Sequence, residues 1–263
     1  MNQTQFEKAV ADLPFARVEF FESVGSTNDV VAAWAREGSS GLCLAAADEQ
    51  TQGRGRSGRR WVTPRGRALA FSVLLETGLA FDAALLGRAS GLGALAVCEA
   101  LERLGLSPQI KWPNDVLTGG RKLCGVLPEA HWSGERLQAL ILGIGINVAA
   151  KALPSPDALA FPATSIEEAT GTQVAPEGLL RSVLERLLAW RPRMGTPDFL
   201  EAWESRLAYK GQRVQLEVGG RTLEAELIGL ATDGGLKLLV NGTERAFQAG
   251  EVQLRPLVDR PGK

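Results

Sequence analysis

Histidine is nearly absent from this sequence. The chain of 263 residues contains one histidine, His131. This count excludes a zinc site with several histidines and a pH switch made of a histidine cluster. It also excludes a catalytic triad that uses any histidine other than His131. His131 lies near a probable hairpin end, and we interpret it as a surface residue.

Cysteine is also scarce, and its pattern excludes a disulfide framework. Cys43, Cys98 and Cys124 are odd in number, far apart and surrounded by apolar neighbours. They form no CxxC pair, and one histidine leaves little choice of partner for a cysteine nucleophile. The sequence therefore predicts three reduced, buried thiols in a cytoplasmic protein.

Long apolar runs are missing as well. The most apolar run, residues 139–150, includes Asn147 and is shorter than the ~20 residues that a membrane helix needs. The N-terminus has no basic start followed by an apolar stretch, so no secretory signal is expected. We predict that the protein has no contact with a membrane.

The charges balance overall but not locally. There are 29 basic and 30 acidic residues and the pI is about 6.0, which disfavours a general nucleic-acid binder. The basic residues comprise 22 Arg and 7 Lys, and six of the arginines fall between Thr51 and Arg67 with no acid among them. Arginine suits planar recognition of phosphate and carboxylate, so this segment is the first candidate for a binding site.

The arginine-rich segment has the composition of a loop that closes over a nucleotide. Gly53, Gly55 and Gly58 let the backbone approach a ligand closely, and Trp61 offers a flat face for a base. A solvated loop, or one that binds nucleic acid without specificity, remains an alternative at this point.

A second candidate is the turn Lys111-Trp-Pro-Asn-Asp115. Pro-Asn-Asp alone is explained as a tight turn, but a lysine at the end of a buried strand requires an anionic partner. Asp115 could pair with that lysine or hold Mg²⁺ bound to a substrate phosphate. Lys122 begins the next strand, so two of the few lysines flank one turn; a surface charge at the strand entry is the simpler explanation for Lys122 alone.

Two further segments carry polar groups at positions where a ligand could bind. Ser26-Thr27-Asn28 precedes a helix and could be only its N-cap, or could hydrogen-bond a small polar ring. Gly143-Ile-Gly-Ile-Asn147 is an alternating strand whose glycines leave space on one face. Asn147 could bond to a loop or face a ligand.

The order of the predicted elements indicates a mixed α/β domain followed by a small antiparallel barrel. We expect strands at 18–21, 42–47, 68–75, 109–112, 123–128 and 137–148. Helices are expected after residue 28 up to Gly38, and at 82–104 (with a break near Gly91 or Gly93), 176–190 and 198–207. Short alternating runs separated by Gly-rich turns follow Tyr209, and we divide the chain into domains at 1–208 and 209–263.

Six segments in this order resemble the biotin–protein ligases, also called biotin–[acetyl-CoA-carboxylase] ligases. They are Ser26-Thr-Asn28, Gln50-Thr-Gln-Gly-Arg-Gly-Arg56 with Trp61, Lys111-Trp-Pro-Asn-Asp115, Lys122-Leu-Cys-Gly-Val-Leu-Pro-Glu129, Gly143-Ile-Gly-Ile-Asn147 and Gly250-Glu-Val-Gln-Leu-Arg255. The resemblance covers nearly the whole chain. It implies the mixed-sheet catalytic domain shared with lipoate ligases and a C-terminal SH3-like barrel.

The resemblance also implies a reaction and residue roles. Biotin and ATP would form biotinyl-5′-AMP, and a lysine of a biotin carboxyl carrier protein would then take the biotin. The catalytic residues implied are Lys122, Lys111 and Arg56. Those implied for biotin are Ser26, Thr27, Asn28, Gln50, Gly53, Arg54, Gly55, Arg56, Lys122 and Gly125. The nucleotide would contact Arg54, Arg56, Trp61, Lys111, Asn114, Asp115, Asn147 and Arg255, and Asp115 could bind the Mg²⁺ that accompanies ATP.

The remaining expectations concern partners and motion. Only 25 residues precede Ser26, so we expect the monofunctional form without a DNA-binding domain. A homodimer through the catalytic sheet is left open. Lipoate or octanoate ligation is the nearest rival; a biotin-sensing repressor and a nucleic-acid-binding module are the rivals from another class. Because a free acyl adenylate hydrolyses in water, we predict that the 51–65 loop is mobile until ligand binds.

Overall fold

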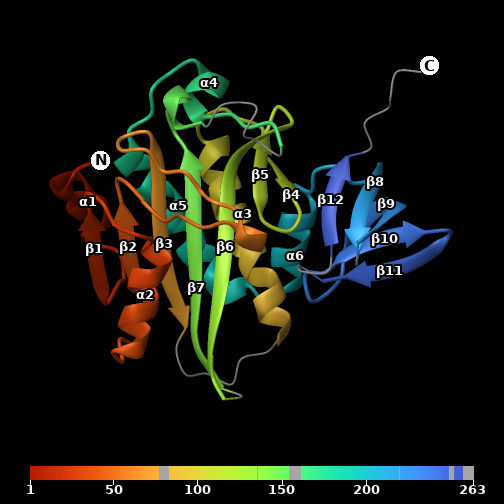
Figure 1. The fold of residues 1–263 in the computed structure, drawn as a ribbon, viewed down its shortest axis with the longest axis horizontal. Helices are drawn as coiled ribbons and strands as arrows, with labels where there is room; N and C mark the ends of the chain where they lie inside the picture. The colour runs from red at the N-terminus through yellow and green to blue at the C-terminus, as the bar shows by residue number, and fades with distance from the viewer. Residues whose placement is uncertain (77–82, 135, 154–160, 219, 249–251, 257–263) are drawn as a thin grey trace.

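The chain folds into a seven-stranded mixed sheet with helices on both faces, followed by a five-stranded antiparallel sheet (Figure 1). The computed structural model describes residues 1–76, 83–134, 136–153, 161–218, 220–248 and 252–256. The predicted α/β domain and the all-β C-terminal part are both confirmed.

The seven-stranded sheet has the order β1-β2-β3-β7-β6-β5-β4. Only β1 and β2 run parallel, and every other neighbouring pair is antiparallel. The strands are β1 (Arg17–Phe21), β2 (Cys43–Ala47), β3 (Ala68–Glu76), β4 (Gln109–Lys111), β5 (Asp115–Thr118), β6 (Arg121–Ser133) and β7 (Arg136–Asn147).

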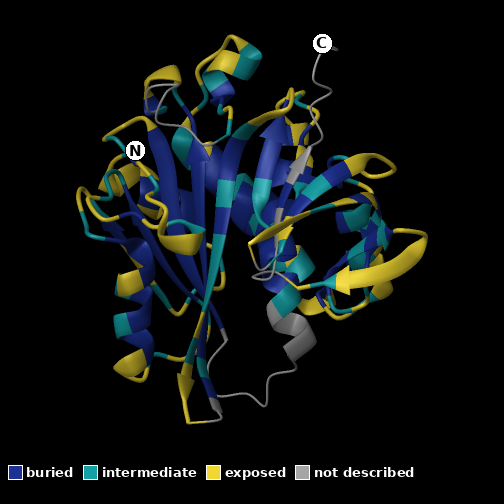
Figure 2. Cartoon of the chain, turned by 45° about the vertical axis from the view of Figure 1, so that its right-hand side comes forward, coloured by how far each residue is buried: buried dark blue, intermediate teal, exposed yellow. Residues whose placement is uncertain are grey.

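Both faces of the sheet are buried, which explains why its central strands read as nearly continuous apolar runs. In β2, Cys43 and Ala45 pack under α2 (Thr27–Arg36), whereas Leu44 and Ala46 belong to the larger core on the opposite face. The longest helices of that larger core are α3 (Ala83–Glu102) and α5 (Pro176–Trp190). Figure 2 shows the central strands in the colour of buried residues.

Helix α3 is continuous, so the predicted break near Gly91 or Gly93 is wrong. A Cβ at Gly91 would lie 2.3 Å from Trp203 Cε3, and one at Gly93 would lie 2.7 Å from Val126 Cγ1. The two glycines therefore permit close packing against α6 (Pro197–Glu204) and β6, and they do not interrupt the helix.

Three helices and strands were not expected from the sequence, and one of them is the short helix α4 (Ile166–Thr170). Helix α1 (Gln3–Val10) begins with a capping box, in which the Asn2 side chain accepts from the Gln5 backbone and the Gln5 side chain accepts from the Asn2 backbone. Strand β5 follows the 111–115 turn directly and pairs with β4 and β6. His131, expected at the surface, is half-buried in β6 opposite Ala139.

The C-terminal sheet has the order β11-β10-β9-β8-β12. Its strands are β8 (Arg213–Val218), β9 (Arg221–Leu230), β10 (Leu236–Val240), β11 (Thr243–Phe247) and β12 (Val252–Pro256). Asn241 and Gly242 have φ of 49° and 77° in the turn between β10 and β11, as their sequence predicts. The short alternating runs therefore indicated this sheet correctly.

The two sheets are joined by a linker that is itself hydrogen-bonded to the first sheet. Ile110 N donates to Arg206 O at 2.7 Å, and Ala208 N donates to Ile110 O at 2.9 Å. The segment around the predicted boundary at 208 and 209 thus lies along the β4 edge.

No helix in the described part of the chain is long and apolar enough to cross a membrane.

Candidate active site

A cavity of about 920 Å³ lies over strands β3, β5, β6 and β7 and under the arginine-rich loop. All of the predicted site residues except Gly53 and Arg255 line it. The fold therefore brings segments as far apart as Ser26 and Asn147 together around one cavity.

The deep end of the cavity is a hydrogen-bonded cluster of neutral side chains. Gln50 Oε1 accepts from the Thr27 backbone N at 2.9 Å and from Thr27 Oγ1 at 3.1 Å. Thr27 Oγ1 and Ser72 Oγ lie 2.7 Å apart, and Ser72 Oγ donates to Asn28 Oδ1 at 2.5 Å. Since the cluster carries no formal charge, it suits a small neutral polar group.

Ser72 belongs to this cluster but was not predicted. It is fully buried in β3, 44 residues from Asn28 in the sequence. The only signal was a single hydroxyl within the apolar run Ala68-Leu-Ala-Phe-Ser-Val-Leu-Leu75. A buried hydroxyl requires a hydrogen-bond partner, so such a residue indicates a polar group nearby.

The glycines of β7 make room for this cluster, as their pattern suggested. A Cβ at Gly143 would lie 2.4 Å from Asn28 Oδ1. Asn28 is buried at the start of α2, and Ser26 provides the N-cap backbone without a side-chain cap bond. Ser26 is therefore not acting as a side-chain cap.

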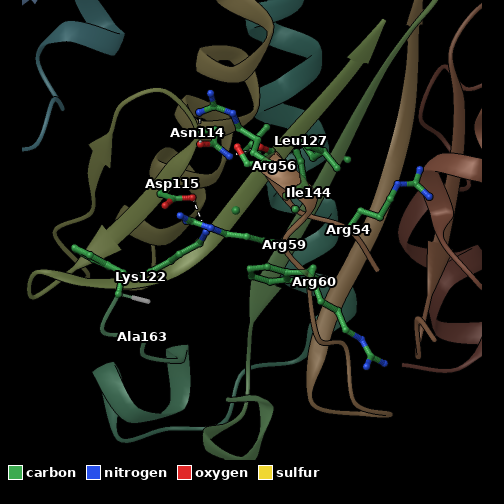
Figure 3. A pocket seen from close by; sticks show the side chains of 18 of the residues that line it. Arg54, Arg56, Arg59, Arg60, Asn114, Asp115, Lys122, Leu127, Ile144 and Ala163 are labelled. Atoms are coloured by element: carbon green, nitrogen blue, oxygen red, sulfur yellow. Dashed lines mark hydrogen bonds and ion pairs between the residues drawn. The ribbon is translucent and has the colours of Figure 1, made fainter. Parts of the chain in front are cut away.

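The other end of the cavity is cationic. Lys122 Nζ lies 2.5 Å from Asp115 Oδ1, and both side chains are largely buried. Arg56 Nη1 donates to Asn114 Oδ1 at 3.2 Å, so the arginine-rich loop contacts the turn between β4 and β5 (Figure 3). Lys111 Nζ lies 4.3 Å from the centroid of the Phe161 ring.

Burial and like charge act together on Arg56. Desolvation lowers the pKa of its guanidinium; Asp115 opposes that shift and the neighbouring Arg59 adds to it. An arginine remains charged even so, and an anionic ligand beside it would offset the cost of holding it there.

Trp61 closes over the floor of the cavity. A Cβ at Gly145 would lie 2.3 Å from Trp61 Cε2, and one at Gly125 would lie 3.3 Å from its Cζ3. Gly125 and Gly145 face each other across β6 and β7. The Lys122 Nζ lies 5.7 Å from the indole centroid. The flat ring thus lies on two glycines beside the cationic end.

Arg54 is placed differently from the other loop arginines. Its guanidinium makes two bonds of 2.7 Å to Asp29 and contacts Glu129 Oε1 at 3.2 Å. Figure 3 shows its side chain directed away from Asp115 and Lys122. The structure therefore places Arg54 on two carboxylates at the edge of the cavity and apart from the cationic end.

Gly53 contributes to the loop fold and lies outside the cavity lining. A Cβ there would lie 2.5 Å from the Trp61 carbonyl oxygen, and Trp61 N donates to Gly53 O at 2.9 Å. Asn147 donates to Thr164 O at 3.0 Å, which is the loop contact that its sequence position allowed. Arg255 lies in β12, where its backbone is paired with Gln215 of β8. The side chain of Arg255 is outside the described part of the structure.

The C-terminal sheet also reaches the cavity. Glu217, Gly220, Thr222 and Leu254 line it. None of these residues was predicted, because the alternating runs after Tyr209 gave no sign of which turn faces the first domain.

The cavity offers few side-chain donors for a metal ion. The described part of the chain contains no group of three or more His, Cys, Asp or Glu side chains that could hold a metal. Asp115 supplies one carboxylate, already paired with Lys122. One carboxylate suffices for a Mg²⁺ that keeps waters and arrives on substrate phosphates, so Asp115 fits that role.

Comparison with known proteins places this fold and cavity in a class. Residues 20–147 match the family model described as the biotin/lipoate A/B protein ligase family, and residues 210–255 match the biotin protein ligase C terminal domain. The chain is 31% identical to the biotin protein ligase of Aquifex aeolicus solved with biotin and ATP, with a TM-score of 0.75 over 92% of this chain and 100% of that one.

Two sequence relatives narrow the class. A biotin–[acetyl-CoA-carboxylase] ligase of Paracoccus denitrificans is 36% identical over 82% of this chain and 91% of its own length. A bifunctional ligase/repressor BirA of Bacillus subtilis is 30% identical over 80% of this chain and 66% of its own length. The chain belongs to the biotin protein ligases, and its activity is biotin–protein ligation.

Proposed function

We propose that biotin and ATP meet in the 920 Å³ cavity, biotin at its neutral end and the phosphates of ATP at its cationic end. The observation that carries this proposal is that one cavity is lined both by the neutral Gln50, Thr27 and Asn28 and by the cationic Lys111, Lys122 and Arg56. The Aquifex aeolicus relative was solved with biotin and ATP, which supports the choice of these two ligands.

The neutral cluster would bind the ureido ring of biotin. A ureido group has two N–H donors and one carbonyl acceptor, and the hydroxyl and amide groups of Thr27, Asn28 and Gln50 can both donate and accept. Ser72, buried behind them, would hold Thr27 and Asn28 in place. The apolar ring and chain would lie along Phe71, Val126, Leu127 and Ile144, which line the cavity between the two ends.

The cationic end would bring two anions together. In the first step an oxygen of the biotin carboxylate bonds to the α-phosphorus of ATP, and the bond from that phosphorus to the bridging oxygen breaks to release pyrophosphate. Lys122 would bridge the carboxylate and the α-phosphate, while Arg56 and Lys111 offset the charge of the phosphates. Trp61 would stack on adenine.

In the second step a neutral lysine amine of the carrier protein attacks the carbonyl carbon of the mixed anhydride. The bond from that carbon to the phosphate oxygen breaks, AMP leaves, and the amine loses a proton. Within this chain, Trp61 and the arginine-rich loop would exclude water from the anhydride.

Asp115 would hold the Mg²⁺ that accompanies ATP, which supplies charge neutralisation at the phosphates when it is bound. The acceptor would be the biotin carboxyl carrier domain of a carboxylase, in line with the acetyl-CoA carboxylase named for the Paracoccus denitrificans relative. Three buried free cysteines are compatible with work in the reducing cytoplasm.

Replacement of Lys122 tests the proposal. Lys122→Ala removes the bridging ammonium, so biotin-dependent pyrophosphate release should fall by about 100-fold or more. Lys8 is exposed on α1 and lies outside the cavity, so Lys8→Ala is the matched control and should keep the full rate. Circular dichroism checks that both variants fold. A normal rate in folded Lys122→Ala would refute the role of this lysine.

A parallel assay separates the rival functions. The wild-type chain is given ATP, Mg²⁺ and either biotin or lipoate, with a carrier domain as acceptor. We expect pyrophosphate release and a covalent mass increase on the carrier in the biotin reaction and neither in the lipoate reaction. Equal turnover of lipoate would favour lipoate ligation, and duplex DNA binding at low ionic strength would favour a repressor.

A further inference from the structure

The turn between β9 and β10, residues 231–235, inserts into the catalytic domain behind the Lys111–Asp115 turn. Trp112 Nε1 donates to Gly234 O at 3.0 Å, and the Trp112 side chain is 2% exposed. Arg88, which is 8% exposed in α3, donates to Thr232 O and to Met194 O. Buried side chains of the first domain thus hold two carbonyl groups of the second.

The fit around the 231–235 turn leaves no space for extra atoms. Gly234 has φ of +85°, and a Cβ there would lie 2.9 Å from Trp203 Cζ3. On the opposite side, a Cβ at Gly87 would lie 2.4 Å from Asp233 O. Because both surfaces use glycine at the contact, a shift of the turn would move the groups that touch it.

The linker holds the other side of the same motif. Ile110 is fully buried, and its backbone N and O pair with Arg206 O and Ala208 N. Both neighbours of Lys111 are therefore bonded to later parts of the chain: Ile110 to the linker and Trp112 to the 231–235 turn. The far end of the turn is fixed by Asn114, whose backbone O accepts from Val126 N at 2.8 Å.

We propose that Trp112 is a positioning residue through which the 231–235 turn sets Lys111 and Asp115 against the phosphates of ATP. The indole N–H has a defined acceptor in the second domain, and Trp112 lines the cavity next to Lys111. The inference rests on the proposed function, since it takes the cationic end of the cavity as the ATP end. Biotin, bound at the neutral end, should be unaffected.

A second tryptophan, away from the 231–235 turn, provides a matched control. Trp112→Phe removes the indole N–H that donates to Gly234 O. Trp190→Phe removes an indole N–H that donates to Glu99 Oε1 at 2.9 Å. Loss of one neutral hydrogen bond corresponds to about a fivefold change in an equilibrium constant. Trp112→Phe should raise the KM for ATP about fivefold and leave the KM for biotin unchanged, whereas Trp190→Phe should change neither by as much as twofold.

Arg88→Lys is the second variant, in case Trp112→Phe folds poorly. It keeps the charge but cannot bond both carbonyls with one planar group, so the KM for ATP should rise while that for biotin stays constant. The proposal is overturned if these variants raise both KM values equally, or if Trp112→Phe has no more effect on the KM for ATP than Trp190→Phe. Absence of biotin-dependent pyrophosphate release in the wild type would instead refute the proposed function itself.

Discussion

Arg54 is held at the rim of the cavity by carboxylates that the sequence does not place near it. Asp29 and Glu129 are 25 and 75 residues away in the chain, yet both contact its guanidinium. The ion pair joins the arginine-rich loop to the first turn of α2 and to β6. It therefore acts on the position of the loop, whereas Arg56 contacts the turn that carries Asp115.

The ion pair should hold the loop in a pH-dependent way. The Arg54 hydrogen bonds keep the pKa of Asp29 below its usual value and outweigh the opposing effect of burial. Because this pKa is lowered in the folded state, the stabilisation is complete above the unfolded value of about 3.9 and is lost as the pH falls through the lowered pKa. Asp29→Asn should thus speed amide exchange in residues 54–61 severalfold at pH 7.

Hydrogen exchange of both proteins at matched pH checks this. The difference between wild type and Asp29→Asn should shrink as the pH falls through the lowered pKa of Asp29. Asp198→Asn, which breaks an exposed pair with Arg193, is the control and should leave the loop unchanged. A loop already unprotected in the wild type would contradict a role for the ion pair, while supporting the predicted mobility of residues 51–65.

Most of the residues singled out from the sequence line one cavity, but the sequence did not show how they pair within it. Lys122 with Asp115, and Gln50 with Thr27, were both among the expected residues. Ser72 was missed because one hydroxyl in an apolar strand has no periodic signal. Its partners are brought to it only when α2 packs across β3.

Among the elements, helices with local end signals were predicted best. Helix α5 matches its predicted range of 176–190, where Pro176 stands at the first position and apolar residues recur on one face. Strand β5 was hidden because Asn114 and Asp115 also fit a simple turn. The error at Gly91 had another cause. Backbone propensity predicts a helix break at glycine, but this glycine is required because Trp203 packs against the position that a Cβ would occupy.

Two helix glycines should therefore respond to alanine with opposite signs. Gly91→Ala places a Cβ 2.3 Å from Trp203 and should destabilise the fold by about 1–3 kcal/mol. Gly178, exposed in α5, has nothing within 4 Å of its Cβ position, so Gly178→Ala should stabilise by up to about 1 kcal/mol. Urea unfolding of both variants gives the two free energies. A stabilising Gly91→Ala would mean that α6 can retreat from α3.

For the molecule as a whole, a net charge of −1 conceals a cationic cavity. Acids elsewhere in the chain balance the loop arginines in number. Two of the seven lysines, Lys111 and Lys122, line the cavity. Composition alone could not show this, because the cavity gathers residues from several strands and from both domains.

The whole fold also determines the behaviour of the cysteines. Cys43, Cys98 and Cys124 are fully buried, and burial raises the pKa of each thiol. A raised pKa means less thiolate at a given pH, so the native protein should not react with a thiol reagent such as Ellman's reagent at pH 8. In guanidinium all three should react. One fast thiol in the native protein would contradict the burial.

The insertion of the 231–235 turn has a consequence for the history of the chain. Gly87 and Trp112 on one side, and Gly234 on the other, form a single contact built from both domains. An exchange of the C-terminal domain between related chains would preserve this contact only if the 231–235 turn and the residues around it, Gly87 and Trp112, were inherited together. The two domains, separable by their strand patterns, should therefore evolve as one unit at this junction.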